Sequence, residues 1–192
     1  MAYAAKNFDN LLGIPGISDQ LLTNHFTLYQ GYVTNTNKVL EELKSLLAAG
    51  QQSSPQAAEL RRRMGWEWNG MRLHELYFAN LTNKPAPYDF NSALIQKITA
   101  DFISMENFEA ELRSVASMRG IGWAVLYHDP AADQLLISWV NEHDQAHLAG
   151  AKPLLVIDVF EHAFMIDYGL KRADYIDAVM KVIDWEAVAA RL

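Results

Sequence analysis

Apolar side chains recur at steps of three and four along residues 18–50, a periodicity that is typical of an amphipathic helix. Ser18 can cap the start of this helix, and Gly50 follows its end. A short polar turn comes next, and Pro55 stands at the first position of a second helical stretch that runs to about Leu81. Two long helices joined by so short a turn are expected to form an antiparallel hairpin.

The pattern changes after the segment 83–87, where two prolines in three residues prevent a helix from continuing. Shorter elements are expected beyond it, namely helices at 92–102 and 107–117 and strands at 123–128, 135–140 and 154–158. We therefore expect an α+β fold with two domains. The first is a long helical hairpin at 1–86, and the second is an α/β domain at 87–192 with a three-stranded antiparallel sheet.

Composition narrows the function classes. The chain has 192 residues, and its 16 basic and 23 acidic side chains give a net charge of −7, which argues against nucleic acid as a partner. It has no cysteine, so disulfides and thiolate metal ligands are excluded. No apolar stretch is long enough to span a membrane, and the first residues lack the apolar core of a signal peptide. We expect a cytoplasmic protein.

The clearest candidate for chemistry is the end of the third expected strand. Asp158 closes an apolar, β-branched run, and His162 follows four residues later. A carboxylate at the end of a buried strand is costly unless positive charge compensates it, which an imidazole and a metal ion could do. The spacing alone has a simpler explanation, in which the aspartate caps a helix and the histidine faces solvent.

Two histidines in the hairpin change this balance. His25 and His74 each lie on the apolar stripe of their helix, so both are expected to point inward. A single buried histidine is usually a core residue, but facing pairs in helical bundles can build metal sites. Together with Asp158 and His162 they give three imidazoles and one carboxylate, a set that suits iron, manganese or zinc and leaves one coordination position open.

Four motifs in this order resemble the iron/manganese superoxide dismutase family over nearly the whole chain. They are His25 ahead of Tyr32-Val-Thr-Asn-Thr-Asn37, Leu73-His74-Glu-Leu-Tyr77-Phe78, Gly120-Ile-Gly-Trp123, and Asp158-Val-Phe-Glu-His162-Ala followed by Asp167-Tyr168. The resemblance implies that one iron or manganese ion is bound by His25, His74, Asp158 and His162. It also implies the dismutation of superoxide to dioxygen and hydrogen peroxide. The alternative is a non-catalytic relative that binds metal on the same scaffold.

The resemblance also suggests residues around the metal. Tyr32 is expected to gate the substrate path, and Arg172 to contribute positive charge near the channel mouth. Some relatives use a glutamine at the position of Gly70 to contact the solvent ligand of the metal, which a glycine cannot do. We therefore assign that contact to His143, with Glu142 as the alternative; otherwise His143 is an exposed loop residue.

Departures from the family lie in the same outer region. The spacing across 25–32 is one residue shorter than is usual, so this helix is expected to be regular where relatives have a bulge. Tyr29 and Met165 replace a histidine and a tyrosine that pair between subunits in many members. Glu161 is the family's bridge to His162 of the partner subunit, which implies a homodimer or tetramer.

Overall fold

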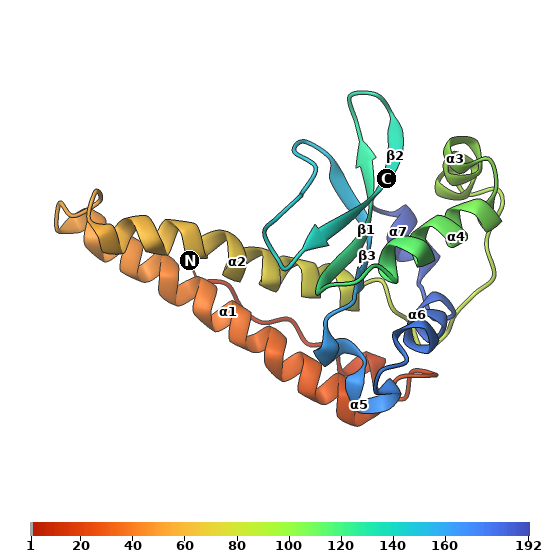
Figure 1. Ribbon diagram of the computed structural model, residues 1–192, viewed down its shortest axis with the longest axis horizontal. Coiled ribbons are helices and arrows are strands. Elements are labelled where there is room, and N and C mark those ends of the chain that lie inside the picture. The colour runs from red at the N-terminus through yellow and green to blue at the C-terminus, as the bar shows by residue number, and fades with distance from the viewer. Residues whose placement is uncertain (1) are drawn as a thin grey trace.

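The computed structural model describes residues 2–192, which form two long helices, a small sheet and several short helices (Figure 1). Along the chain the elements are η1 (Asp9–Leu11), α1 (Asp19–Ala48), α2 (Pro55–Phe78), α3 (Ala93–Phe102), α4 (Met105–Ala116), β1 (Gly122–Asp129), β2 (Gln134–Asn141), β3 (Lys152–Asp158), η2 (Glu161–Ala163), α5 (Met165–Tyr168), α6 (Arg172–Met180) and α7 (Trp185–Ala189). The α+β fold with a three-stranded antiparallel sheet is confirmed. Within residues 2–192, no helix has the length and apolarity needed to cross a membrane.

The long hairpin consists of α1 and α2, which lie side by side and run in opposite directions (Figure 1). The Ser18 hydroxyl accepts a hydrogen bond from the backbone N–H of Leu21, and the Ser54 hydroxyl accepts one from Ala57. Both helices therefore begin at side-chain caps, each of which contributes about 1 kcal/mol. α1 is α-helical over all 30 residues, so the regular helix expected from the short spacing is present.

One face of α1 is buried against the rest of the protein. Its buried residues follow the helical period and are Leu21, Leu22, His25, Tyr29, Val33, Thr36 and Val39. Full burial of each leucine or valine stabilises the fold by about 1.5–3 kcal/mol relative to exposure. Because His25 lies on this face, the hydrophobic pattern that docks the helix also carries an imidazole into the interior.

α2 ends three residues earlier than the sequence pattern suggested, at Phe78 rather than at Leu81. The backbone N–H groups of Asn80 and Leu81 bond to carbonyls three residues back, which tightens and closes the last turn. Leu81 then forms an isolated bridge with Ile183, and its side chain stays buried. The apolar spacing correctly predicted that Leu81 is buried. It could not show the helix end, because a buried residue just beyond the helix fits the same spacing.

The sheet has the order β2–β1–β3, with β1 in the centre and antiparallel to both neighbours. In its register Trp123 lies beside Asp158 on one side and Val140 on the other. Gly122 precedes this point with φ near +152°, and a Cβ there would lie 2.1 Å from the Val140 carbonyl oxygen. Glycine is therefore required where β1 begins, next to the strand end that carries Asp158.

The end of β3 is anchored by tyrosines from two helices. The Tyr175 hydroxyl on α6 donates to the backbone carbonyl of Asp158 at 2.7 Å. The Tyr77 hydroxyl on α2 lies 3.0 Å from the Tyr175 hydroxyl, and Tyr77, Tyr175 and Asp158 are all buried. These bonds hold the strand end between the hairpin and α6, so the position of the Asp158 carboxylate is set from both sides.

Candidate metal centre

Four predicted donors come together where the hairpin meets the sheet. His25 comes from α1, His74 from α2, Asp158 from the last position of β3, and His162 from η2. One nitrogen or oxygen atom of each residue lies within 4.8 Å of the others. The side chains of His25, His74 and Asp158 have no exposed surface, whereas that of His162 keeps 26%.

The three imidazoles point the same atom toward one carboxylate oxygen. Nε2 of His25 and of His162 each lie 3.2 Å from Oδ2 of Asp158, and Nε2 of His74 lies 3.5 Å from it. The other carboxylate oxygen, Oδ1, accepts a hydrogen bond from the backbone N–H of Phe160 at 2.9 Å. The carboxylate is thus fixed on one side and faces the three nitrogens with the other.

The ring of His74 shows that this arrangement needs a cation. Its Nδ1 lies 2.6 Å from the carbonyl oxygen of Gly70, and only a nitrogen that carries hydrogen can bond there. In the neutral ring Nε2 is therefore left with a lone pair that faces Asp158 Oδ2 and has no hydrogen-bond partner. Two buried acceptors facing each other repel, and a metal ion between them removes the conflict.

The electrostatics of the cluster favour metal-binding forms of the side chains. Burial lowers the pKa of His25 and holds the pKa of His74 well below its ordinary value, so both rings are neutral at pH 7. Burial alone would raise the pKa of Asp158, but His162 and His25 beside the carboxylate keep it below its usual range. Neutral imidazoles and an ionised carboxylate are the states that bind metal.

The donor set fits iron or manganese. With bonds of about 2.0–2.2 Å, neighbouring ligand atoms lie about 3–4.5 Å apart, which agrees with the separations in the cluster. Nitrogen and carboxylate donors without thiolate suit these ions, and a set of four leaves room for a further ligand. These four residues could therefore hold one ion.

A second group of side chains lies beside the donors and is centred on His143. This imidazole is fully buried, so the alternative of an exposed loop residue is wrong. Its Nδ1 accepts a hydrogen bond from the indole N–H of Trp123 at 3.1 Å, and its Nε2 lies 2.7 Å from the hydroxyl of Tyr32. The ring of Phe160 stacks on it with centroids 4.7 Å apart.

The Trp123 contact fixes the proton on His143. An indole N–H can only donate, so Nδ1 must be the acceptor and Nε2 must carry the hydrogen that bonds to Tyr32. Burial lowers the pKa of His143 to about 4 and raises the pKa of Tyr32 to about 12. Both groups are neutral at pH 7, and the Tyr32 hydroxyl keeps a proton that it can donate elsewhere.

Gly70 makes room for Tyr32 in this arrangement. A Cβ at this position would lie 2.6 Å from Cδ1 of the Tyr32 ring, too close for any side chain. The Tyr32 ring also stacks on His74, with centroids 5.2 Å apart. Gly70 has no side chain that could form a hydrogen bond at the site. Its lack of a Cβ instead allows Tyr32 to approach the cluster.

Comparison with known proteins agrees with this geometry. Residues 90–191 match the family model of iron/manganese superoxide dismutases, C-terminal domain. A superoxide dismutase [Mn] of Haloferax volcanii is 37% identical over 178 residues, covering 92% of this chain and 87% of the relative. A superoxide dismutase [Mn] of Haloarcula marismortui is 38% identical, covering 91% and 85%, and a superoxide dismutase [Fe] of Aquifex pyrophilus is 36% identical, covering 93% and 85%.

The chain belongs to the iron/manganese superoxide dismutase family. Its relatives include proteins named for either metal at similar identity. Membership of the family therefore does not distinguish between iron and manganese.

Two further predicted residues of this superoxide dismutase family member lie outside the donor cluster. The Arg172 guanidinium donates to the backbone carbonyls of Gly120, Ser117, Met118 and Val159, at 2.8 Å for Gly120 and 3.1 Å for Ser117. It thus ties the start of the sheet to α6. One of its acceptors, the carbonyl of Val159, belongs to the residue that follows Asp158. Glu142 is partly exposed and has φ of 52°.

Tyr29, Met165 and Glu161 are the three positions that the sequence links with subunit pairing. Tyr29 is buried within the hairpin, where its hydroxyl donates to Glu75 at 3.1 Å. Met165 is 45% exposed, with Ile166 and Leu170 also on the surface nearby, and Glu161 is exposed beside them. Tyr29 therefore serves the interior of the chain, and the segment around Met165 exposes three apolar side chains, Met165, Ile166 and Leu170, together with the charged Glu161 and Asp167.

The sequence does not reveal the role of Trp123 beside His143. Trp123 is expected at the start of a strand and in the Gly120–Trp123 motif, and the structure adds that its N–H sets the tautomer of His143. Phe160 lies between two predicted donors in the sequence and stacks on both His143 and His162. The motif Asp158-Val-Phe-Glu-His162 already places Phe160 near the predicted donors, and the structure adds its stacking on His143.

Proposed function

We propose that this protein is a superoxide dismutase that uses one iron or manganese ion, bound by His25, His74, Asp158 and His162. The observation that carries the proposal is the convergence of three Nε2 atoms on Oδ2 of Asp158 in a buried cluster. The ion would supply the one-electron chemistry, by which one superoxide is oxidised to dioxygen and a second is reduced to hydrogen peroxide.

The protein's part is to hold the donors in neutral or anionic form and to orient them. The carbonyl of Gly70 keeps the hydrogen of His74 on Nδ1, so that Nε2 remains the donor atom. The backbone N–H of Phe160 fixes the Asp158 carboxylate in the same way. Such outer contacts hold the donors in place before the ion binds.

The reaction consumes two protons, and we propose that Tyr32 and His143 manage one of them. His143 donates to the Tyr32 hydroxyl, which leaves the Tyr32 proton free to point toward the donor cluster. Tyr32 is partly exposed, so it can also exchange with solvent and line the path of the substrate. In this proposal Tyr32 is the direct hydrogen-bond donor at the site, and His143 acts through Tyr32, because both of its ring nitrogens are engaged by Trp123 and Tyr32.

Arg172 and Glu161 complete the proposal. Arg172 would attract superoxide electrostatically, because a chain with net charge −7 repels an anion elsewhere on its surface. Glu161 would bind His162 of the partner subunit in a homodimer or tetramer. The exposed apolar side chains Met165, Ile166 and Leu170 beside it support an interface there. We also propose a cytoplasmic antioxidant role, since a chain without disulfides is typical of a reducing compartment.

The test combines metal analysis with an activity assay on purified protein. We expect about one iron or manganese per chain and dismutation of superoxide that disappears on metal removal. His25→Ala should lose both metal and activity, whereas His128→Ala, which removes a histidine outside the cluster, should keep both. Bound metal without activity would favour the non-catalytic alternative, and full metal content in His25→Ala would contradict the ligand assignment.

A further inference from the structure

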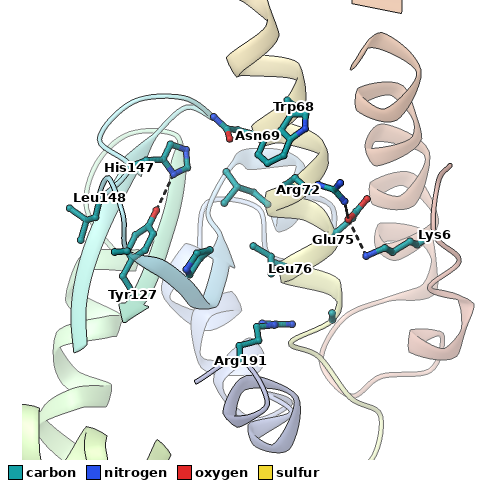
Figure 2. Close-up of a pocket in the computed structure, with 14 residues that line it drawn as sticks. Lys6, Trp68, Asn69, Arg72, Glu75, Leu76, Tyr127, His147, Leu148 and Arg191 are labelled. Carbon is teal, nitrogen blue, oxygen red and sulfur yellow. Dashed lines mark hydrogen bonds and ion pairs between the residues drawn. The ribbon is translucent and has the colours of Figure 1, made fainter. Parts of the chain in front are cut away.

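A cavity lies beside the segment that carries His143 and is lined in part by His147 and Leu148 of that segment. It is bounded by α2, by β1 and the start of β3, and by the connection between β2 and β3 (Figure 2). Its volume is about 540 Å³, within the range of about 300–1,000 Å³ that is usual for small-molecule sites. None of the four donors lines it, so this cavity is separate from the proposed metal centre.

The walls of the cavity are largely apolar. Leu73 and Leu76 of α2 and Leu148 of the connection contribute aliphatic surface, and Trp68 and Tyr127 contribute aromatic rings from α2 and β1 (Figure 2). Burial of an organic body against such walls is favourable by roughly 25 cal/mol per Å² of apolar surface. The shape and lining thus suit a compact ligand with an aromatic or branched apolar body.

The charges around the cavity are mostly positive. Lys6 and Arg72 both contact the carboxylate of Glu75, at 3.1 Å and 2.7 Å, and Arg191 lies at the opposite end of the cavity (Figure 2). Three cations with one carboxylate leave an excess of positive charge. In a chain whose net charge is −7, such a local excess stands out and favours an anion.

Arg191 is the cation of this cavity that has no carboxylate within ion-pair distance among residues 2–192. It is half-buried, and its Nη1 donates to two neutral acceptors, the side-chain oxygen of Asn80 and the carbonyl of Leu154. Within residues 2–192 it forms no ion pair with a carboxylate, and its Nε and Nη2 donors have no hydrogen-bond partner. Burial lowers the pKa of Arg191, and the nearby charge of Asp184 opposes this shift. Nε and Nη2 of Arg191 are not among the buried atoms that lack a partner, so they keep access to solvent and an anion in the cavity can reach them.

We propose that this cavity binds a small amphipathic organic anion, with an aromatic or branched apolar body between Trp68 and Tyr127 and an acidic group at Arg191. A fork of free guanidinium donors matches a carboxylate, sulfonate or phosphate group. The ligand would be held by apolar contact along most of its surface and oriented by this one ionic contact.

The occupant would touch the segment that positions His143. His147 lines the cavity, accepts a hydrogen bond from the Tyr127 hydroxyl at its Nδ1 and donates from Nε2 to the backbone carbonyl of His143 at 2.9 Å (Figure 2). A ligand packed against His147 therefore lies one hydrogen bond from the backbone of His143, whose imidazole contacts Tyr32. The site is close enough to influence the metal centre without sharing any of its donors.

The test uses a charged and an uncharged probe of the same shape on the metal-loaded protein. 8-Anilinonaphthalene-1-sulfonate, whose fluorescence rises on burial, should bind saturably at one site per chain. N-phenyl-1-naphthylamine, which lacks the sulfonate, should bind about tenfold more weakly. Arg191→Gln should weaken the sulfonate probe about tenfold and leave the uncharged probe unchanged, since its amide can still donate to the Leu154 carbonyl.

Two further variants keep the test decisive. Ala79→Leu adds bulk at an exposed position that lines the cavity and should weaken both probes, without depending on the fold-supporting bonds of Arg191. Arg62→Gln, which removes a solvent-exposed charge elsewhere on α2, should change neither. The proposal is overturned if neither probe binds saturably, if both bind the wild type equally, or if Ala79→Leu binds the sulfonate probe as the wild type does.

Discussion

Replacing His143 by glutamine should make the stability of the metal-free protein less sensitive to acid. The pKa of His143 falls from 6.5 to about 4 on folding, because burial disfavours the charged ring. The folded state therefore keeps His143 neutral while the unfolded chain takes up a proton below pH 6.5. Stability from this residue is fully present above pH 6.5 and is lost as the pH falls from there toward 4.

The size of the effect follows from that interval. At about pH 5 the solution lies about 1.5 units below the unfolded pKa and still above the folded one, and each unit corresponds to about 1.4 kcal/mol. Acidification from about pH 7.5 to pH 5 should therefore cost the wild type about 2 kcal/mol through His143 alone. Glutamine can accept from Trp123 and donate to Tyr32, so His143→Gln preserves both contacts and removes only the titration.

Urea unfolding of both metal-free proteins at the two pH values measures this difference. The free energy of unfolding should fall by about 2 kcal/mol more in the wild type than in His143→Gln over the same interval. Titration of the His143 ring by NMR gives an independent value of the folded pKa. Parallel pH dependences, or a folded pKa near 6.5, would refute the argument that this imidazole is buried in its neutral form.

Three other outcomes can be checked by single substitutions. Gly70→Ala should displace the Tyr32 ring and lower the free energy of unfolding by about 1–3 kcal/mol, because a Cβ would lie 2.6 Å from that ring. The effect should appear as a lower melting temperature and reduced activity, and an unchanged variant would show that the ring moves freely. Glu161→Ala should weaken subunit association and metal retention, measured by analytical ultracentrifugation and metal analysis, and a native protein that is monomeric at micromolar concentration would refute the interface. Arg172→Gln should slow turnover and flatten its dependence on ionic strength, and an unchanged salt response would leave Arg172 only its backbone hydrogen bonds.

The sequence predicts some parts of this fold and site better than others. His25 and His74 could be placed because helical periodicity states which side of a long helix is buried, and Asp158 because an apolar strand has an identifiable end. The burial of His143 could not be derived from periodicity. Its segment turns at Glu142 and Ala146, both with positive φ, so neither a helical nor a strand period applies to the direction of its side chain.

Arg172 illustrates a different limit. Its expected place near the channel mouth came from the family resemblance, but its four carbonyl acceptors lie in segments more than ten residues away in the sequence. Backbone carbonyls carry no signature in the side-chain sequence. A structural role that is built on them becomes visible only in three dimensions.

The division of the donors between the hairpin and the strand end has a consequence for the docking of these two parts. His25 and His74 lie on one side of the linker 83–87, and Asp158 and His162 on the other. Neither side alone offers more than two of the donors, so all four come together only when the hairpin and the sheet are docked. An ion held by all four would therefore stabilise the docked arrangement, and its removal would weaken the contact between the hairpin and the end of the sheet.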